Sequence, residues 1–551
     1  MSFSKQSFAA DWIYTGATVW IGDADHRTSA ALAVKDGRIL AAGSETEVLR
    51  FAGPATEVED LRGAFVMPGF LDSHTHAPGT ALPDLYEVSL YTCKSPEACL
   101  RAVRRFIREH PEADEVRGAG WDIAGFTDKE LIHGPRKARL DELSDVRPII
   151  LRSYDGHALW LNSAAFARYG ITPRTPEPAG GVIEHDPHTG ALWGTLKEEA
   201  AKLVPPRIYS VQQTVRALKL YQARMHRYGI TGIASIQGAG LGASAEAFQL
   251  MEREGDLLLR IRFAKEIDPE HDVDDQIAAL REVKVRCDGS LFKVTGTKFF
   301  ADGVVEGGTA FLHAPYAAKA GRESDENNAA VWGLGDLASA YRAAQRAGFQ
   351  SVTHAIGDAA TRRVLNALRL AGAARWRDAR PVITHLQVVR PQDIRRMRHL
   401  GVVASVQPFW HMKEPQWWSR VDATMLGVRR ATREYPLRRL FDEGLTVASS
   451  SDHPITVQPN PLVAIEIGVT RNLAAAAWYG VADITRADSK RHLLGKGQRV
   501  SVERMLASYT RHGAFLMRCE NECGADRKST RLNQSRPHLV CRLLLEKKKK
   551  N

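Results

Sequence analysis

The chain has 551 residues, 44% of them hydrophobic and 25% charged, and its mean hydropathy is −0.28. This composition excludes the disordered and collagen-like classes, and no apolar run approaches the roughly 18 residues that a membrane-spanning helix needs. The formal net charge is +11, but residues 525–551 alone contribute +7. The remaining body is nearly neutral, so neither a nucleic acid nor a membrane is expected as a partner.

The amino-terminal residues predict a small β unit over residues 1–62. Short apolar runs alternate there with turn signals, and Asp36-Gly37 is a strong hairpin signal. The first residues lack a basic patch followed by an apolar stretch, so no secretory signal is expected. Six cysteines form neither a disulfide framework nor a zinc spacing, and we expect a cytoplasmic protein with reduced thiols.

Residues 63–496 predict an α/β barrel. Eight strand-like runs alternate with helical stretches, at 65–72, 230–235, 259–264, 291–300, 349–358, 381–389, 401–409 and 445–454. Residues 77–209 separate the first run from the second, and we interpret them as an insertion. Long loops at the carboxyl-terminal face of a barrel usually shape its active site.

Four histidines lie at three of the predicted strand ends. His74 and His76 lie two residues apart after the first run, so their side chains project to one side of the sheet, as two ligands of one metal require. His354 and His385 close two successive strands, 31 residues apart. Each could instead be a hydrogen-bonded core histidine, but equivalent positions at adjacent strand ends favour a shared site.

Two charged residues extend this set. Asp452 follows the last predicted strand and offers a carboxylate to a metal or to its water, although it could equally cap a helix. Lys298 lies in an otherwise apolar strand, where a cation costs desolvation energy unless it is paired or neutralised. Two interpretations stay open: an ion pair with Asp302, or a lowered pKa that allows reaction with carbon dioxide to an N-carboxylate bridging two cations.

These six residues, with strings such as SYDGHALWLNSAAF and KFFADGVVEGGTA, resemble the metal-dependent amidohydrolase superfamily. The finer resemblance is to the branch that contains N-substituted formamide deformylase and exoenzyme-regulator-like amidohydrolases. It implies a distorted (β/α)8 TIM barrel of the α/β class, with a β-sandwich built from residues 1–62 and a segment returning at about 497–524.

The resemblance also implies the chemistry. One or two divalent cations, most plausibly zinc, would be bound by His74, His76, Lys298, His354, His385 and Asp452, with Lys298 carboxylated if two are present. Asp452 would act as the catalytic proton carrier. The expected reaction is hydrolysis of a non-peptide carbon–nitrogen bond in a small amide or formamide. Alternatives are an isomerase or carbon–oxygen hydrolase of the same fold, or a non-catalytic regulatory or binding protein.

Substrate contacts are predicted from two regions. His157 and Asn162 belong to the insertion, whereas Gln407 and His411 follow the seventh strand; any of them could instead pack the loops. The assembly considered is a homodimer.

The last 27 residues predict a non-native tail. The run from Asp526 to Asn533 matches the translation of a common sequencing adapter, and the lysines before Asn551 match a poly-A stretch. A basic, disordered terminus is the alternative. On the first interpretation, the family's own segment after about Gly524 is missing.

Overall fold

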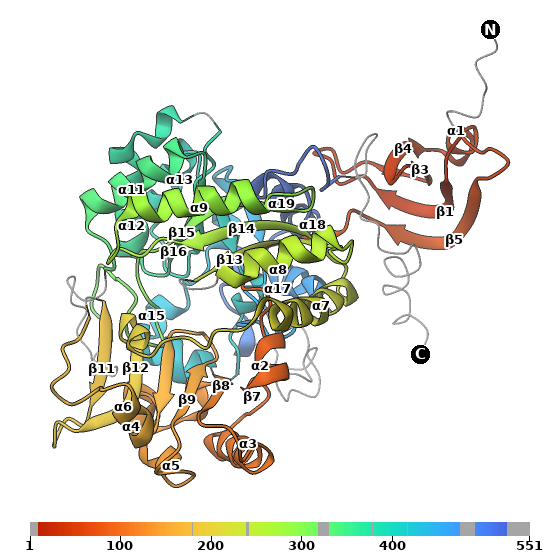
Figure 1. Ribbon diagram of the computed structural model, residues 1–551. Coiled ribbons are helices and arrows are strands. Elements are labelled where there is room, and N and C mark those ends of the chain that lie inside the picture. Colours follow the sequence, from red (N-terminus) through yellow and green to blue (C-terminus); the bar gives the residue numbers. More distant parts are fainter. Residues whose placement is uncertain are drawn as a thin grey trace.

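The computed structural model describes residues 9–178, 180–238, 242–317, 330–376, 378–415, 417–473 and 491–525. Figure 1 shows a barrel surrounded by helices, a small sheet to one side of it, and a second sheet below it. The predicted tail from residue 526 lies outside the described residues.

The amino-terminal sheet contains five strands and one short helix: β1 Trp12–Trp20, β2 Thr28–Ser29, β3 Ala31–Lys35, β4 Arg38–Gly43, α1 Glu45–Leu49 and β5 Glu57–Val66. Strand β1 is antiparallel to β3 and parallel to β5. Asp36 and Gly37 both have positive φ, as the predicted two-residue hairpin requires. Ile13, Ala33 and Val48 are fully buried and form part of the core of this unit.

Residues 497–524 add no strand to this sheet, which corrects the expectation that they complete a β-sandwich. They form α18 (Val502–Tyr509) and α19 (Arg511–Leu516). Leu516 and Met517 pack with Leu71, Val382, Val403 and other residues of the barrel strands, so this segment closes one end of the barrel interior. The segment is helical because its apolar residues recur at helical spacing. This spacing places them on one face of each helix, where they are buried against the barrel.

Eight parallel strands form the barrel, as the sequence predicts: β6 Phe70–Thr75, β13 Ile230–Gln237, β14 Arg260–Glu266, β15 Phe292–Phe300, β16 Gln350–Ala355, β17 Val382–His385, β18 Val403–Val406 and β19 Val447–Ser449. The last strand lies beside the first, since Ser73 Oγ donates to Ser449 O at 3.0 Å and Asp452 N donates to His74 O at 2.9 Å. The sheet therefore curls almost into a closed barrel.

Helices cover the barrel: α7 Val211–Arg227, α8 Gly242–Arg253, α9 Val273–Cys287, α11 Leu334–Arg346, α12 Asp358–Ala371, α13 Pro391–His399, α16 Leu437–Asp442 and α17 Pro461–Thr470. Helix α7 illustrates why they form. Ser210 and Gln213 make a capping box at its start, and Leu218, Tyr221 and Met225 recur at helical spacing on its buried face.

The segment between β6 and α7 carries a six-stranded sheet in the order β11-β12-β10-β9-β8-β7. Its elements are α2 Ala81–Tyr86, β7 Val88–Ser89, α3 Pro96–Glu109, β8 Val116–Trp121, α4 Asp128–His133, α5 Ala138–Asp141, β9 Ile149–Ser153, β10 Ala158–Leu161, α6 Ser163–Arg168, β11 Gly181–His185 and β12 Leu192–Glu198. Trp121 and Trp160 pack edge to face in its core. We call this unit the inserted sheet.

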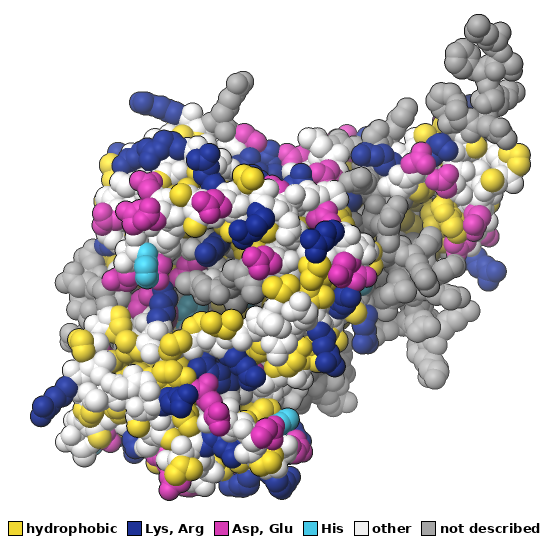
Figure 2. All heavy atoms as spheres, in the orientation of Figure 1, with side chains coloured by type: hydrophobic (Ala, Val, Ile, Leu, Met, Phe, Trp, Pro, Cys, Tyr) yellow, Lys and Arg dark blue, Asp and Glu magenta, His cyan; other side chains and the backbone are white. Residues whose placement is uncertain are grey.

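The surface carries both signs of charge. On the face in Figure 2, Lys and Arg side chains are interspersed with Asp and Glu. None of the helices in the described part of the chain is long and apolar enough to span a membrane.

Candidate functional site

A cavity of about 1270 Å³ lies between the carboxyl ends of the barrel strands and the inserted sheet. Its lining includes His76, Lys298, His354, His385 and Asp452 from the barrel, and Tyr154, His157 and Glu198 from the inserted sheet. The carboxyl end of a barrel is where catalytic residues of this fold gather, because several strands end there together.

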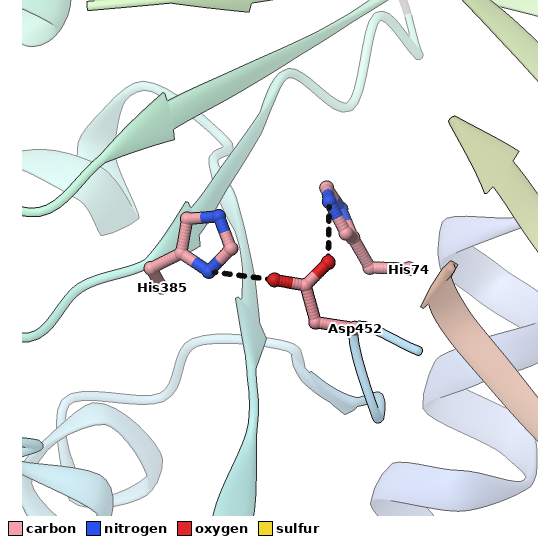
Figure 3. A group of neighbouring side chains, drawn as sticks. All are labelled: His74, His385 and Asp452. Carbon is pink, nitrogen blue, oxygen red and sulfur yellow. Dashed lines mark ion pairs between the residues drawn. The ribbon is translucent and has the colours of Figure 1, made fainter. Parts of the chain in front are cut away.

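The floor of this cavity brings His74, His385 and Asp452 together, with possible ligand atoms within 4.8 Å of one another. Figure 3 shows the Asp452 carboxylate between the two imidazoles: Oδ1 lies 3.5 Å from His74 Nε2, and Oδ2 lies 3.8 Å from His385 Nδ1. His76 Nε2 is 2.9 Å from the same Oδ1. The ring of His354 lies 4.6 Å from that of His385. His74, His76 and His385 thus surround the Asp452 carboxylate, and His354 lies beside His385.

Backbone conformation helps to place these side chains. His385 and Asp452 both have positive φ, at 77° and 56°. Residues other than glycine adopt this region at an energetic cost, and such positions cluster at functional sites. The conformation turns the chain sharply where β17 and β19 end.

Burial determines the charge states at this floor. It holds the pKa of His74 and of His354 well below the usual value and lowers that of His385 to about 4, so these imidazoles are neutral near pH 7. Burial alone would raise the pKa of Asp452. In the acid range where the carboxylate would take up a proton, attraction to His74 and His76 outweighs the effect of burial and holds the pKa of Asp452 well below its usual range. Neutral imidazole nitrogens around a carboxylate are the ligand forms that a divalent cation requires.

His74 gives a direct test of fit to a metal. The side chain is fully buried, and neither ring nitrogen has a hydrogen-bond partner among the described residues. A buried polar atom without a partner costs free energy unless something satisfies it. A cation between His74 and Asp452 would do so, and the residues present therefore fit a divalent metal.

Three neighbouring imidazoles are each fixed through one ring nitrogen. His76 Nδ1 lies 3.0 Å from Ile236 O, His354 Nε2 lies 3.0 Å from Gly303 O, and His385 Nδ1 lies 2.9 Å from Gln407 Oε1. Oxygen acceptors of this kind fix the tautomer of metal-ligating histidines. The second nitrogen of each ring is thereby left for a cation.

Lys298 lies at the end of β15 with 1% exposure, and its Nζ is 4.5 Å from the Phe300 ring centre. Burial lowers its pKa to about 8, against the opposing charges of Asp452 and Glu266. The ion pair with Asp302, one of the two interpretations left open, is not formed. The Asp302 carboxylate instead accepts hydrogen bonds from three backbone amides, of Phe311, Ile356 and Gly357.

Of the predicted substrate contacts, His157 lines the cavity but Gln407 and His411 do not. Gln407 is fully buried and is used to hold His385, while its Nε2 donates to Ser450 Oγ at 2.8 Å. His411 is 1% exposed and stacks on Tyr435 with ring centres 4.8 Å apart. Both predictions are corrected because these side chains lie behind the cavity wall.

Asn162 is also corrected, because it is a structural residue of the inserted sheet. It is fully buried, and its Oδ1 accepts from Ala165 N at the start of α6 and from Ile149 N, both at 2.9 Å. Its Nδ2 donates to Ser144 O and Arg147 O. All its hydrogen-bonding capacity is used within the protein.

We therefore expect Asn162→Ala to lower the free energy of unfolding by about 3 kcal/mol, because several buried backbone groups lose their partner. Chemical denaturation measures this effect, and KM should not change. If the variant has normal stability but a raised KM, Asn162 contacts the substrate, and the structural interpretation is wrong.

Sequence reasoning missed Glu198, which lines the cavity and lies 2.7 Å through Oε2 from His157 Nδ1. Burial opposes the charged form of His157, but the Glu198 carboxylate raises its pKa to about 10. Only the pairing of β10 with β12 brings these residues together, and no local motif marks that pairing.

Comparison with known proteins finds relatives in sequence and in fold. The chain is 29% identical to YtcJ of Bacillus subtilis over 451 residues, 80% of each chain. It is 26% identical to N-substituted formamide deformylase of Arthrobacter pascens over 541 residues, 95% of this chain and 92% of the relative. An uncharacterised metal-dependent hydrolase of Pyrococcus furiosus shares the fold, with a TM-score of 0.67 at 23% identity over 95% of this chain and 99% of the other.

The amidohydrolase family profile matches residues 57–525. With the barrel and the His/Asp floor in place, this match over most of the chain shows that the protein belongs to the amidohydrolase family.

Proposed function

We propose that the protein hydrolyses the non-peptide carbon–nitrogen bond of an N-substituted amide or formamide, with one or two zinc ions at the His/Asp floor. The observation that carries this proposal is the Asp452 carboxylate, held ionised among neutral imidazoles at the base of a large cavity. Similarity to a formamide deformylase along nearly the whole chain supports this substrate class. The cytoplasmic location stays a prediction.

A divalent cation bound by His74, His76, His354, His385 and Asp452 would supply a Lewis acid, which lowers the pKa of water and polarises a carbonyl group. Lys298 would join this set if it is carboxylated. Asp452 accepts the proton of the water molecule as its oxygen adds to the carbonyl carbon. It then donates that proton to the nitrogen as the carbon–nitrogen bond breaks, which releases an acid and an amine.

The cavity also suits a bulky nitrogen substituent. Phe409, Trp410, Met412 and Trp417 line it, and the Trp410 ring stacks on His385 at 5.7 Å. Apolar and aromatic walls favour an apolar group on the substrate nitrogen.

The test is hydrolysis of N-butylformamide and N-benzylformamide by zinc-loaded protein, with formate and amine measured separately. We expect equal amounts of the two products, faster release from the benzyl compound, and loss of turnover after chelation that zinc restores. If fully zinc-loaded, folded protein releases neither product from formamides or from the matching acetamides, the proposed substrate class is wrong.

A further inference from the structure

Two ionisable residues of the inserted sheet, His157 and Glu198, line the cavity next to its floor of His74, His385 and Asp452. His157 directly precedes β10, Glu198 ends β12, and the two side chains meet through Nδ1 and Oε2 at 2.7 Å. The His157 side chain is 18% exposed, and its ring lies 5.5 Å from that of His354. Since Nδ1 is occupied by Glu198, Nε2 is the nitrogen left for a molecule in the cavity.

Glu198 is itself firmly held by the barrel. Its Oε1 accepts from Thr309 Oγ1 at 2.5 Å, and its side chain is 12% exposed. Its φ is 50°, a costly conformation for a side-chain-bearing residue. A Cβ on Gly303 would overlap both the Glu198 carboxylate and Thr309 Oγ1, so the absence of a side chain at Gly303 makes room for this contact.

The same loop ties the pair to the floor of the cavity. Gly303 O accepts from His354 Nε2, while Thr309, six residues on, holds Glu198. Residues 303–309 therefore set the position of His157 relative to His354. A hydrogen bond from Nδ1 to a carboxylate favours the doubly protonated ring, in which Nε2 also carries a hydrogen.

We propose that His157 is a catalytic residue of the inserted sheet, donating a hydrogen bond from Nε2 to the carbonyl oxygen of the substrate, and that Glu198 is its positioning residue. The proposal rests on the hydrolytic function proposed above. As the oxygen of water adds to the carbonyl carbon, the π electron pair moves onto the carbonyl oxygen, and the hydrogen bond from His157 stabilises the negative charge. The pair returns when the carbon–nitrogen bond breaks, and His157 keeps its proton throughout.

The kinetic test uses zinc-loaded His157→Ala, His157→Gln and Glu198→Gln with N-benzylformamide. Removing one donor of this kind typically costs about 100- to 1000-fold in kcat. We expect that loss for His157→Ala with little change in KM, a smaller loss for His157→Gln, which keeps an N–H donor, and an intermediate loss for Glu198→Gln. His188→Ala, on an exposed turn of the same sheet, is the matched control and should behave as wild type. A normal kcat for His157→Ala, or a loss that only follows lost zinc or stability, overturns the proposal.

Binding of inorganic phosphate, a tetrahedral anion, tests the donor role of His157 independently of which substrate the protein hydrolyses. We expect zinc-loaded wild-type protein to bind it in a calorimeter, and His157→Ala to bind it at least about tenfold more weakly at equal zinc content, since a charged hydrogen bond is lost. If this difference appears but no amide is hydrolysed, the substrate class is wrong and the donor role of His157 stands. Equal affinities, or no binding by the wild-type protein, overturn the donor role.

Discussion

The Asp452→Asn variant is expected to lose about 1000-fold or more in kcat while it stays folded. An amide of the same shape cannot accept the proton of water, and proton transfer by a positioned group contributes about 100- to 10,000-fold on its own. The side chain also faces His74 and His385, so some metal affinity should be lost with its negative charge. Turnover of N-benzylformamide at matched zinc content measures the first effect separately from the second.

The control for Asp452→Asn is Asp256→Asn, which removes a surface carboxylate paired with Lys219. It should be indistinguishable from wild type. Turnover of Asp452→Asn within tenfold of wild type at full zinc occupancy would show that another group carries the proton.

The second large effect is expected from His74→Ala, which should lose bound metal and turnover together. His74 is fully buried, with no hydrogen-bond partner for either nitrogen among the described residues, and a bound cation would supply the missing partner. Its removal also leaves the Asp452 carboxylate with fewer partners. We expect zinc affinity to fall at least about tenfold, as measured by competition with a chelator.

His188→Ala again serves as the histidine control for His74→Ala. Zinc content and turnover equal to those of the wild-type protein would remove His74 from the ligand set. Retained zinc with lost turnover would instead assign it a role in the reaction itself.

The barrel could be predicted from the sequence because each strand is a short apolar run bounded by turn residues, and the His and Asp residues mark the ends of those runs. His74 and His76 are recognisable from local spacing alone, while His354 and His385 become meaningful only when the repeat of strand and helix is counted. The structure brings these residues around Asp452, but whether each binds a metal stays a prediction.

What could not be predicted depends on long-range contacts. The side-chain amides of Asn162 and Gln407 could bind either a substrate or another group of the protein. Only the fold shows that Asn162 bonds to buried backbone groups and that Gln407 bonds to His385. Glu198 meets His157, which lies 41 residues earlier in the sequence. Residues 497–524 were expected to return to the sandwich, whereas burial of Leu516 and Met517 inside the barrel makes them part of its closed end.

The measurement that tests the central claim most directly is elemental analysis of folded, monodisperse wild-type protein after incubation with zinc and removal of the excess. The account predicts one or two tightly bound zinc ions per chain. A well-folded protein that retains none would contradict the metal centre at His74, His385 and Asp452, and with it the hydrolytic function proposed here.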